Sequence, residues 1–188
     1  MARIEPINTT TKDGIAIRVR TVDPLDAEPL LALFDHVTVT SNFNVMLPGE
    51  PGTTVEDMRE RIEKFSDTDN RLMLVATHAD RLVGEIAFHG RPPFRMQHGG
   101  HFGIGIHAAW RGRGLGRILI QTLLDWATAH PTIEKIRLGV LADNHHAIAL
   151  YTSMGFVEDG RHEGEFKFGP DKYIDDIQMV QWVKPRKV

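Results

Sequence analysis

Residues 111–116, with the sequence RGRGLG, are the strongest candidates for chemistry, and an apolar helical pattern follows them from Ile118. Glycines allow a backbone to turn tightly and to bring its N–H groups close to a ligand. The start of the following helix adds unpaired N–H donors and a partial positive charge. The segment therefore predicts a socket for a phosphate or pyrophosphate group, with Arg111 and Arg113 able to reach its oxygens.

The spacing of the glycines separates several kinds of phosphate-binding loop. A P-loop would end in Gly-Lys-Ser/Thr, whereas residues 116–118 are Gly-Arg-Ile. The dinucleotide fingerprint needs G-x-G-x-x-G, and the spacing here is G-x-G-x-G. Glu134 nevertheless lies about 20 residues further on, where that fingerprint places an acidic residue. A third pattern, Q/R-x-x-G-x-G/A, fits Arg111, Gly114 and Gly116 without adjustment, and a loop without any ligand is the remaining alternative.

A second motif covers residues 144–156 and reads N-x-x-A-x-x-L-Y-x-x-x-G-F. Asn144 is a good N-cap because its side chain can accept from the first free N–H groups of a helix. Gly155 stands where a C′ glycine would end that helix. Asn144, Ala147 and Tyr151 are spaced so that they share one helix face. Taken alone, Tyr151 would be a half-buried aromatic residue with a satisfied hydroxyl.

Together the two motifs resemble the GNAT N-acetyltransferase superfamily, most closely over residues 102–156. Segments 95–98, 102–104 and 173–179 are similar to a bacterial branch that includes amino-acid N-acetyltransferases, and this match is less specific. The resemblance implies an α/β fold with a central mixed, mostly antiparallel sheet flanked by helices. It also implies a splayed strand pair at the cofactor site.

Acetyl-CoA is the acetyl donor that the resemblance implies, bound along the splayed strand and the glycine loop. Residues 102–106 alternate apolar residues with glycine, a pattern that often marks close backbone approach by a ligand. The expected cofactor-binding residues are Ile104, Ile106, His107, Arg111, Gly112, Arg113, Gly114, Leu115, Gly116, Asn144, Ala147 and Tyr151.

The implied reaction is direct attack of an amine on the thioester through a tetrahedral intermediate. Backbone N–H groups near Ile106 could stabilise the oxyanion. Tyr151 matches the family position for the acid that protonates the departing thiolate. Many family members carry a carboxylate near the start of this strand, where the present chain has His101. His101 and Glu85 are therefore the two candidates for the general base.

The expected function is N-acetylation of a primary amine, of an L-amino acid or another small molecule. Acetylation of a protein N-terminus or lysine and a non-catalytic acyl-CoA sensor are the alternatives. A nicotinamide oxidoreductase is disfavoured by the glycine spacing. The acceptor pocket is expected from loops 41–52 and 160–171. Its candidate lining residues are Phe43, Met46, Phe166 and Phe168.

Composition sets further expectations for this chain of 188 residues, which is expected to be a single domain over 1–188. Hydrophobic residues make up 41%, which favours a globular fold, and the formal net charge of -3 disfavours nucleic-acid binding. The absence of cysteine excludes disulfides and thiolate catalysis, and the histidines lack the acidic neighbours of a metal site.

No membrane segment or signal peptide is found, so a cytoplasmic location is expected. A homodimer is a further expectation from the family.

The hydrophobic patterns predict strands alternating with helices, with hairpins prominent. The predicted strands are 15–20, 71–78, 82–89, 102–106, 135–141, one from 156, and 173–182. The predicted helices are 23–34, 54–65, one after the glycine loop, and one from 144 to the glycine at 155. Residues 37–54 and 90–100 are predicted to be connections rich in proline and glycine.

Overall fold

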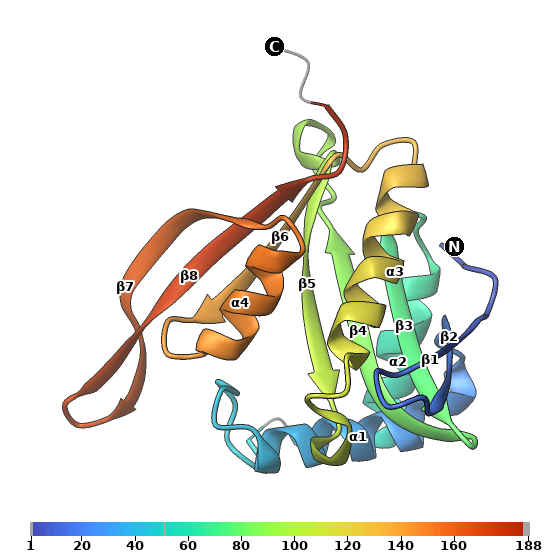
Figure 1. Ribbon diagram of the computed structural model, residues 1–188, viewed down its shortest axis with the longest axis horizontal. Coiled ribbons are helices and arrows are strands. Elements are labelled where there is room, and N and C mark those ends of the chain that lie inside the picture. The colour runs from blue at the N-terminus through green and yellow to red at the C-terminus, as the bar shows by residue number, and fades with distance from the viewer. Residues whose placement is uncertain (1, 51, 186–188) are drawn as a thin grey trace.

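The computed structural model describes residues 2–50 and 52–185, which form an eight-stranded sheet with helices on both faces (Figure 1). The strand order is β1-β2-β3-β4-β5-β6-β8-β7. Neighbouring strands are antiparallel, except that β5 and β6 run parallel. The mixed, mostly antiparallel sheet expected from the sequence is therefore confirmed. The strands are β1 (Ile7–Thr10), β2 (Ala16–Thr21), β3 (Arg71–His78), β4 (Arg81–Gly90), β5 (Gly99–Ile106), β6 (Lys135–Leu141), β7 (Val157–Gly169) and β8 (Lys172–Trp182).

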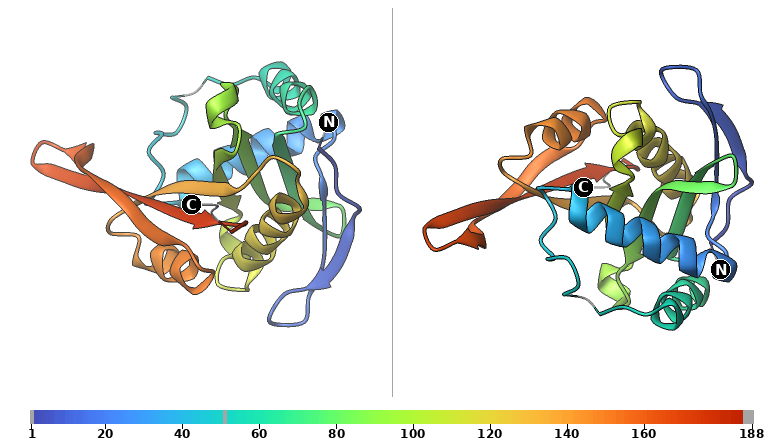
Figure 2. Two further views of the ribbon diagram at one scale, coloured as in Figure 1. Left: turned by 90° about the horizontal axis from the view of Figure 1, so that it is seen from above. Right: turned by 90° about the horizontal axis from the view of Figure 1, so that it is seen from below.

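Two helical layers cover the sheet, as Figure 2 shows. On one face lie α1 (Ala27–Thr40) and α2 (Val55–Ser66), and on the other lie α3 (Leu115–Ala129) and α4 (His145–Ser153). Each layer packs its apolar side chains against the strands. One buried cluster includes Leu33, Met58 and Val75, and a larger one includes Leu119 and Phe88. The sheet is thus buried on both sides where the two layers overlap. Within the described ranges no helix is both long and apolar enough to cross a membrane.

The parallel strands β5 and β6 separate part-way along their length. They pair only from Gly99 opposite Lys135 to His101 opposite Arg137, although both strands continue beyond these positions. Figure 1 shows the two strands diverging below this point. The splayed strand pair is therefore confirmed. From Phe102 onward, the edge of β5 that faces β6 has no ladder partner.

Helix α1 runs to Thr40, beyond the predicted end at residue 34, so the connection predicted from residue 37 begins too early. Its last turns are rich in β-branched residues, which lower helix propensity. Two of these residues bond back to the preceding turn of the helix. The Thr38 hydroxyl donates to the Phe34 carbonyl, and the Thr40 hydroxyl donates to the His36 carbonyl. Helix α2 begins as predicted, with Thr54 and Asp57 forming a capping box.

The region 160–171, predicted as a loop, is mostly strand. Strand β7 continues to Gly169, pairs with β8, and forms a long hairpin that extends away from the helices (Figure 1). Most of its residues are exposed on both faces, so no apolar alternation reveals it in the sequence. Strand β1 was missed for the same reason, because its residues are also largely exposed.

Candidate active site

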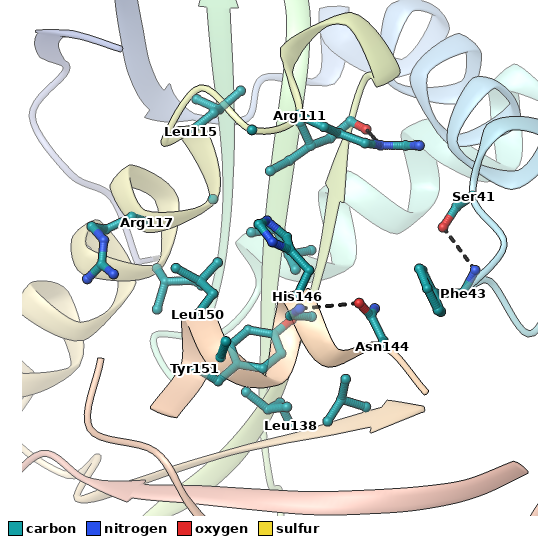
Figure 3. Close-up of a pocket in the computed structure, with 18 of the residues that line it drawn as sticks. Ser41, Phe43, Arg111, Leu115, Arg117, Leu138, Asn144, His146, Leu150 and Tyr151 are labelled. Carbon is teal, nitrogen blue, oxygen red and sulfur yellow. Dashed lines mark hydrogen bonds between the residues drawn. The ribbon is translucent and has the colours of Figure 1, made fainter. Parts of the chain in front are cut away.

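A cavity of about 750 Å³ occupies the opening between β5 and β6 (Figure 3). Its walls come from β5, β6, the start of α3, α4 and the segment after α1. Phe43 of that segment lies across the cavity from Tyr151 of α4. Because the splay opens the sheet, residues from both faces reach one continuous space. A ligand there can be approached from the α3–α4 side and from the α1–α2 side.

The glycine loop forms one end of this cavity. Gly112 and Gly114 have φ of 75° and 87°, a backbone conformation that residues with a side chain rarely adopt. Gly114 is the N-cap of α3, so no side chain there accepts from the first N–H groups of the helix. These donors remain available at the positive end of the helix dipole. The tight turn predicted from the sequence is confirmed, and it suits an anionic group.

Most of the expected cofactor-binding residues line the cavity. They are Ile104, Ile106, Arg111, Gly112, Gly114, Leu115, Gly116, Asn144, Ala147 and Tyr151. His107 and Arg113 lie outside the lining. The His107 ring stacks on His36 at 3.8 Å, and its Nδ1 accepts from the Ala109 N–H. Asn144 caps α4 as predicted, since its side chain accepts from the Ala147 N–H at 3.2 Å.

Both arginines of the loop bond to protein groups. Arg111 donates from Nε to the Ile106 carbonyl at 3.1 Å, and its other nitrogens donate to the carbonyl and hydroxyl of Thr40 at 2.8 and 2.9 Å. Figure 3 shows its guanidinium turned toward α1. Arg113 pairs with Asp13 at 2.6 Å. In this arrangement Arg111 ties the end of α1 to the end of β5, and its expected phosphate contact stays a prediction.

Arg111→Ala is expected to lower the free energy of unfolding by about 1–2 kcal/mol, because the two hydrogen bonds that Arg111 donates to Thr40 of α1 and the one that it donates to Ile106 of β5 are lost at a partly solvated site. Denaturant unfolding of the variant and wild type measures this difference. Arg18→Ala, at an exposed position of β2, is the matched control. Equal stability of Arg111→Ala and wild type would contradict the linking role.

Tyr151 supplies a phenol to the cavity wall from α4. Its side chain is 7% exposed and lies edge-on to Phe102 and Phe156, with ring centroids 6.1 Å away in each case. Burial raises the pKa of Tyr151 to about 12. The hydroxyl is therefore protonated throughout the physiological range and can act as a proton donor.

Glu85 lies on the α1–α2 side of the sheet, near the lining residue Val37 but outside the cavity lining itself. It pairs with Gly105 across β4 and β5. A Cβ built on Gly105 would lie 3.1 Å from Glu85 Oε1 and 3.7 Å from Val37 Cγ2, and Val37 lines the cavity. Burial raises the pKa of Glu85 to about 7, and the charge of Arg61 opposes the rise. A carboxylate with this pKa can accept a proton near neutral pH.

His101, the other candidate base, lies where β5 is still paired with β6, opposite Arg137. Its ring stacks on His89 at 5.0 Å, and the side chain is not part of the cavity lining. Partial burial and the charge of Arg91 lower the pKa of His101. Neither candidate is part of the lining, and Glu85 is favoured because it lies near the lining residue Val37 and has the pKa better suited to a base.

The segment at the end of α1 contributes Ser41, Asn42 and Phe43 to the cavity, as expected for Phe43. Met46, Phe166 and Phe168 are not in the lining, and the last two lie on the extended β7–β8 hairpin. Sequence reasoning missed several lining residues. Some lie far from the motifs, and only the fold brings them to the cavity: Lys12, Val37, Thr40, Leu138, Gly139, Val140 and Leu141. Others lie within or directly beside the motifs but were not singled out: Trp110, Arg117, His146 and Ser153.

Comparisons with known proteins agree with this geometry. The family model "Acetyltransferase (GNAT) family" matches residues 41–156. The L-amino acid N-acetyltransferase AaaT of Escherichia coli is 25% identical over 119 residues, 63% of this chain and 73% of that protein. A GNAT-family acetyltransferase from Streptococcus pneumoniae superposes with a TM-score of 0.84 at 26% identity, over 88% of this chain and 99% of that chain.

A further structural neighbour contains a ligand. The Salmonella typhimurium protein yncA, solved with its cofactor acetyl-CoA, has a TM-score of 0.77 at 19% identity. The superposition covers 92% of this chain and 96% of that chain. At this level of identity the likeness concerns the fold.

Proposed function

Because the chain belongs to the acetyltransferase (GNAT) family, whose acetyl donor is acetyl-CoA, we propose that it acetylates the primary amine of a small molecule, in particular an L-amino acid. The observation that carries this proposal is the cavity in the splay, with Tyr151 in its wall and Glu85 near its lining residue Val37. The named activity of the Escherichia coli relative supports an L-amino acid as acceptor.

The features of the cavity fit the donor. The glycine loop and the start of α3 offer N–H groups for a pyrophosphate. The free edge of β5 offers backbone groups for the amides of the pantetheine arm, as an added strand would use them. The apolar side chains of Ile104, Ile106 and Leu150 line the space between. Acetyl-CoA supplies a thioester, whose carbonyl the acceptor amine attacks.

We assign the proton transfers to two side chains. Glu85 takes a proton from the incoming ammonium group, directly or through one water, so that the amine is neutral when it attacks. The C–N bond then forms, the C–S bond breaks, and Tyr151 gives its proton to the departing sulfur. The tyrosinate recovers the second proton lost by the nitrogen. One proton is released overall, through Glu85.

The charge that develops on the carbonyl oxygen also needs a partner. We propose backbone N–H groups near Ile106 for this role, because β5 has no ladder partner on that side after His101. Donors held in a sheet are preorganised, so they cost little reorganisation during the reaction.

The proposal is tested by incubating the purified protein with acetyl-CoA and a panel of L-amino acids, polyamines, aminoglycosides and peptides. Free thiol release and mass spectrometry of the acceptor report the reaction. We expect acetylation of a small amine to exceed acetylation of peptides. Preferred transfer to a peptide N-terminus or a lysine would overturn the choice of acceptor. Tight acetyl-CoA binding without any transfer would support a sensor instead.

In this proposal the acceptor amine binds on the α1–α2 side of the cavity, and the absence of a side chain at Gly103 leaves room for it there. The hydrogen of Gly103 points to the same face as that of Gly105, toward α1 and α2, and a built Cβ meets no atom within 4 Å. A side chain is therefore tolerated there without backbone strain. Gly103→Leu is expected to raise the acceptor KM at least about 10-fold by blocking this end, while the acetyl-CoA Kd stays unchanged.

Gly160→Leu is the matched control, because Gly160 also has open space around it but lies on β7 away from the cavity. Steady-state kinetics on both variants measures the difference. Equal acceptor KM in the two variants would exclude Gly103 from the acceptor path.

We also infer that residues 1–188 act as one domain. The support is that one sheet carries both helical layers, and that both contribute to the cavity through the splay. A homodimer stays a prediction, to be checked by light scattering on the purified protein.

A further inference from the structure

The turn between β1 and β2 is rigidly built. Thr11 Oγ1 accepts from the Ile15 N–H at 3.1 Å and donates to Asp13 Oδ1 at 2.5 Å. The Gly14 N–H donates to the Thr11 carbonyl at 3.0 Å, and Gly14 has φ of 79°. These bonds fix the position of Lys12 at the tip of the hairpin.

This turn docks on the glycine loop, about a hundred residues away in the sequence. The Lys12 N–H donates to the Arg113 carbonyl at 3.0 Å. The carboxylate of Asp13 pairs with the Arg113 guanidinium at 2.6 Å, and that guanidinium lies over the Trp110 ring at 5.5 Å. Arg113, which does not line the cavity, thus holds the hairpin against the loop.

The Lys12 side chain lies directly over Gly114 and lines the cavity. A Cβ built on Gly114 would lie 3.0 Å from Lys12 Cγ and 3.4 Å from its Cε. Its acidic neighbour Asp13 is already paired with Arg113. Across residues 2–50 and 52–185, the Lys12 ammonium forms no ion pair.

Other positive groups lie at the same end of the cavity as Lys12. The ammonium group lies beside the N-terminus of α3, which carries a partial positive charge. Arg117, in the first turn of the same helix, also lines the cavity, and it donates to Ser153 Oγ at 2.6 Å. A phosphate group bound at this end of the cavity would accept from the Lys12 ammonium.

We propose that Lys12 binds a phosphate group of the coenzyme and that the β1–β2 turn forms one wall of the coenzyme site. This inference rests on the proposed function, since it takes acetyl-CoA as the ligand. It assigns a binding role to the N-terminal hairpin, which carries none of the sequence motifs. It also gives Arg113 a positioning role, through Asp13 and the Lys12 backbone.

The test compares wild type with Lys12→Met, which keeps the aliphatic stem over Gly114 but removes the charge. Calorimetric titration with CoA is expected to show a Kd about 5- to 30-fold weaker in Lys12→Met. Lys12→Arg is expected to stay within about 3-fold of wild type, because the charge remains. Lys167→Met, on the distant β7 strand, is the matched control and should leave the Kd unchanged.

Truncated ligands identify the phosphate group. If Lys12 contacts the diphosphate, dephospho-CoA also binds more weakly to Lys12→Met, and if it contacts the 3′-phosphate, only CoA does. In either case kcat/KM with S-acetylpantetheine, which has neither group, should be unchanged. An unchanged CoA Kd, or an equal loss with S-acetylpantetheine, would overturn the role of Lys12. Failure of wild type to bind CoA would overturn the proposed function itself, and this inference with it.

Discussion

Glu85→Gln is expected to lower turnover by about 10²- to 10⁴-fold at neutral pH, which is the range of general base catalysis. The substitution keeps the size and shape of the side chain but removes its ability to accept a proton. Because Glu85 lies beside Gly105 and Val37 rather than against the glycine loop, the acetyl-CoA Kd should be unchanged. The loss should therefore fall on kcat.

The pH dependence gives a sharper signature of this role. Burial raises the pKa of Glu85 to about 7, so about half of the molecules carry the basic form at that pH. The basic form becomes more abundant as pH rises, and turnover of wild type should therefore fall about tenfold per unit below 7. Glu85→Gln should lack this limb, leaving only the titration of the acceptor amine.

The measurement is kcat at saturating acetyl-CoA and acceptor from pH 5 to 9, with a binding titration for each protein. Glu163→Gln, at an exposed position on β7, is the control and should match wild type. A wild-type kcat in Glu85→Gln would exclude Glu85 as the base and would leave His101 as the remaining candidate. An acidic limb that persists in the variant would point the same way.

Tyr151→Phe is expected to lower turnover by about 10- to 10²-fold, at or below the lower limit of the range for proton transfer. The ring contacts with Phe102 and Phe156 are kept, so stability and acetyl-CoA affinity should hold. Only the hydroxyl proton is lost. The effect should be modest because a thiol has a pKa of only about 8.5, so a thiolate leaves readily. Water can also replace the phenol in part.

Steady-state kcat and an acetyl-CoA titration on the variant test this expectation. Tyr173→Phe offers a matched control, because Tyr173 is the other tyrosine of the chain and is 57% exposed. Full activity in Tyr151→Phe would leave Tyr151 as a packing residue. A weaker acetyl-CoA Kd with unchanged kcat would make it a binding residue instead.

Several features of the fold could be predicted because neighbouring residues encode them. Strand β6 matches its predicted bounds, and α4 begins after the predicted cap Asn144. The turn at Gly112 and Gly114 follows from the conformations that only glycine adopts easily. Strand β7 was predicted to begin near residue 156, but its continuation through the region predicted as a loop could not be, because an exposed strand held by its neighbour β8 shows no apolar alternation.

The residues of the candidate site could likewise be predicted only in part. The motifs identified the glycine loop and Tyr151, and the structure places both at the cavity. The sequence could not decide between His101 and Glu85, because the choice depends on where β5 leaves β6. It also predicted that Arg111 and Arg113 contact the phosphate groups. In the structure their guanidiniums bond to Thr40 and Asp13, which lie far away in the chain.

The sequence by itself thus determined the family, the sheet type and the backbone shape of the loop, since caps, glycine conformations and hydrophobic periodicity act within a few residues. Only the tertiary structure decided which groups lie beside each charged side chain. The docking of the β1–β2 turn brings Lys12 over Gly114, and the packing of β4 against β5 partly buries Glu85 beside Val37. Charge pairing and desolvation act through space, so residues remote in sequence set the chemistry of the cavity.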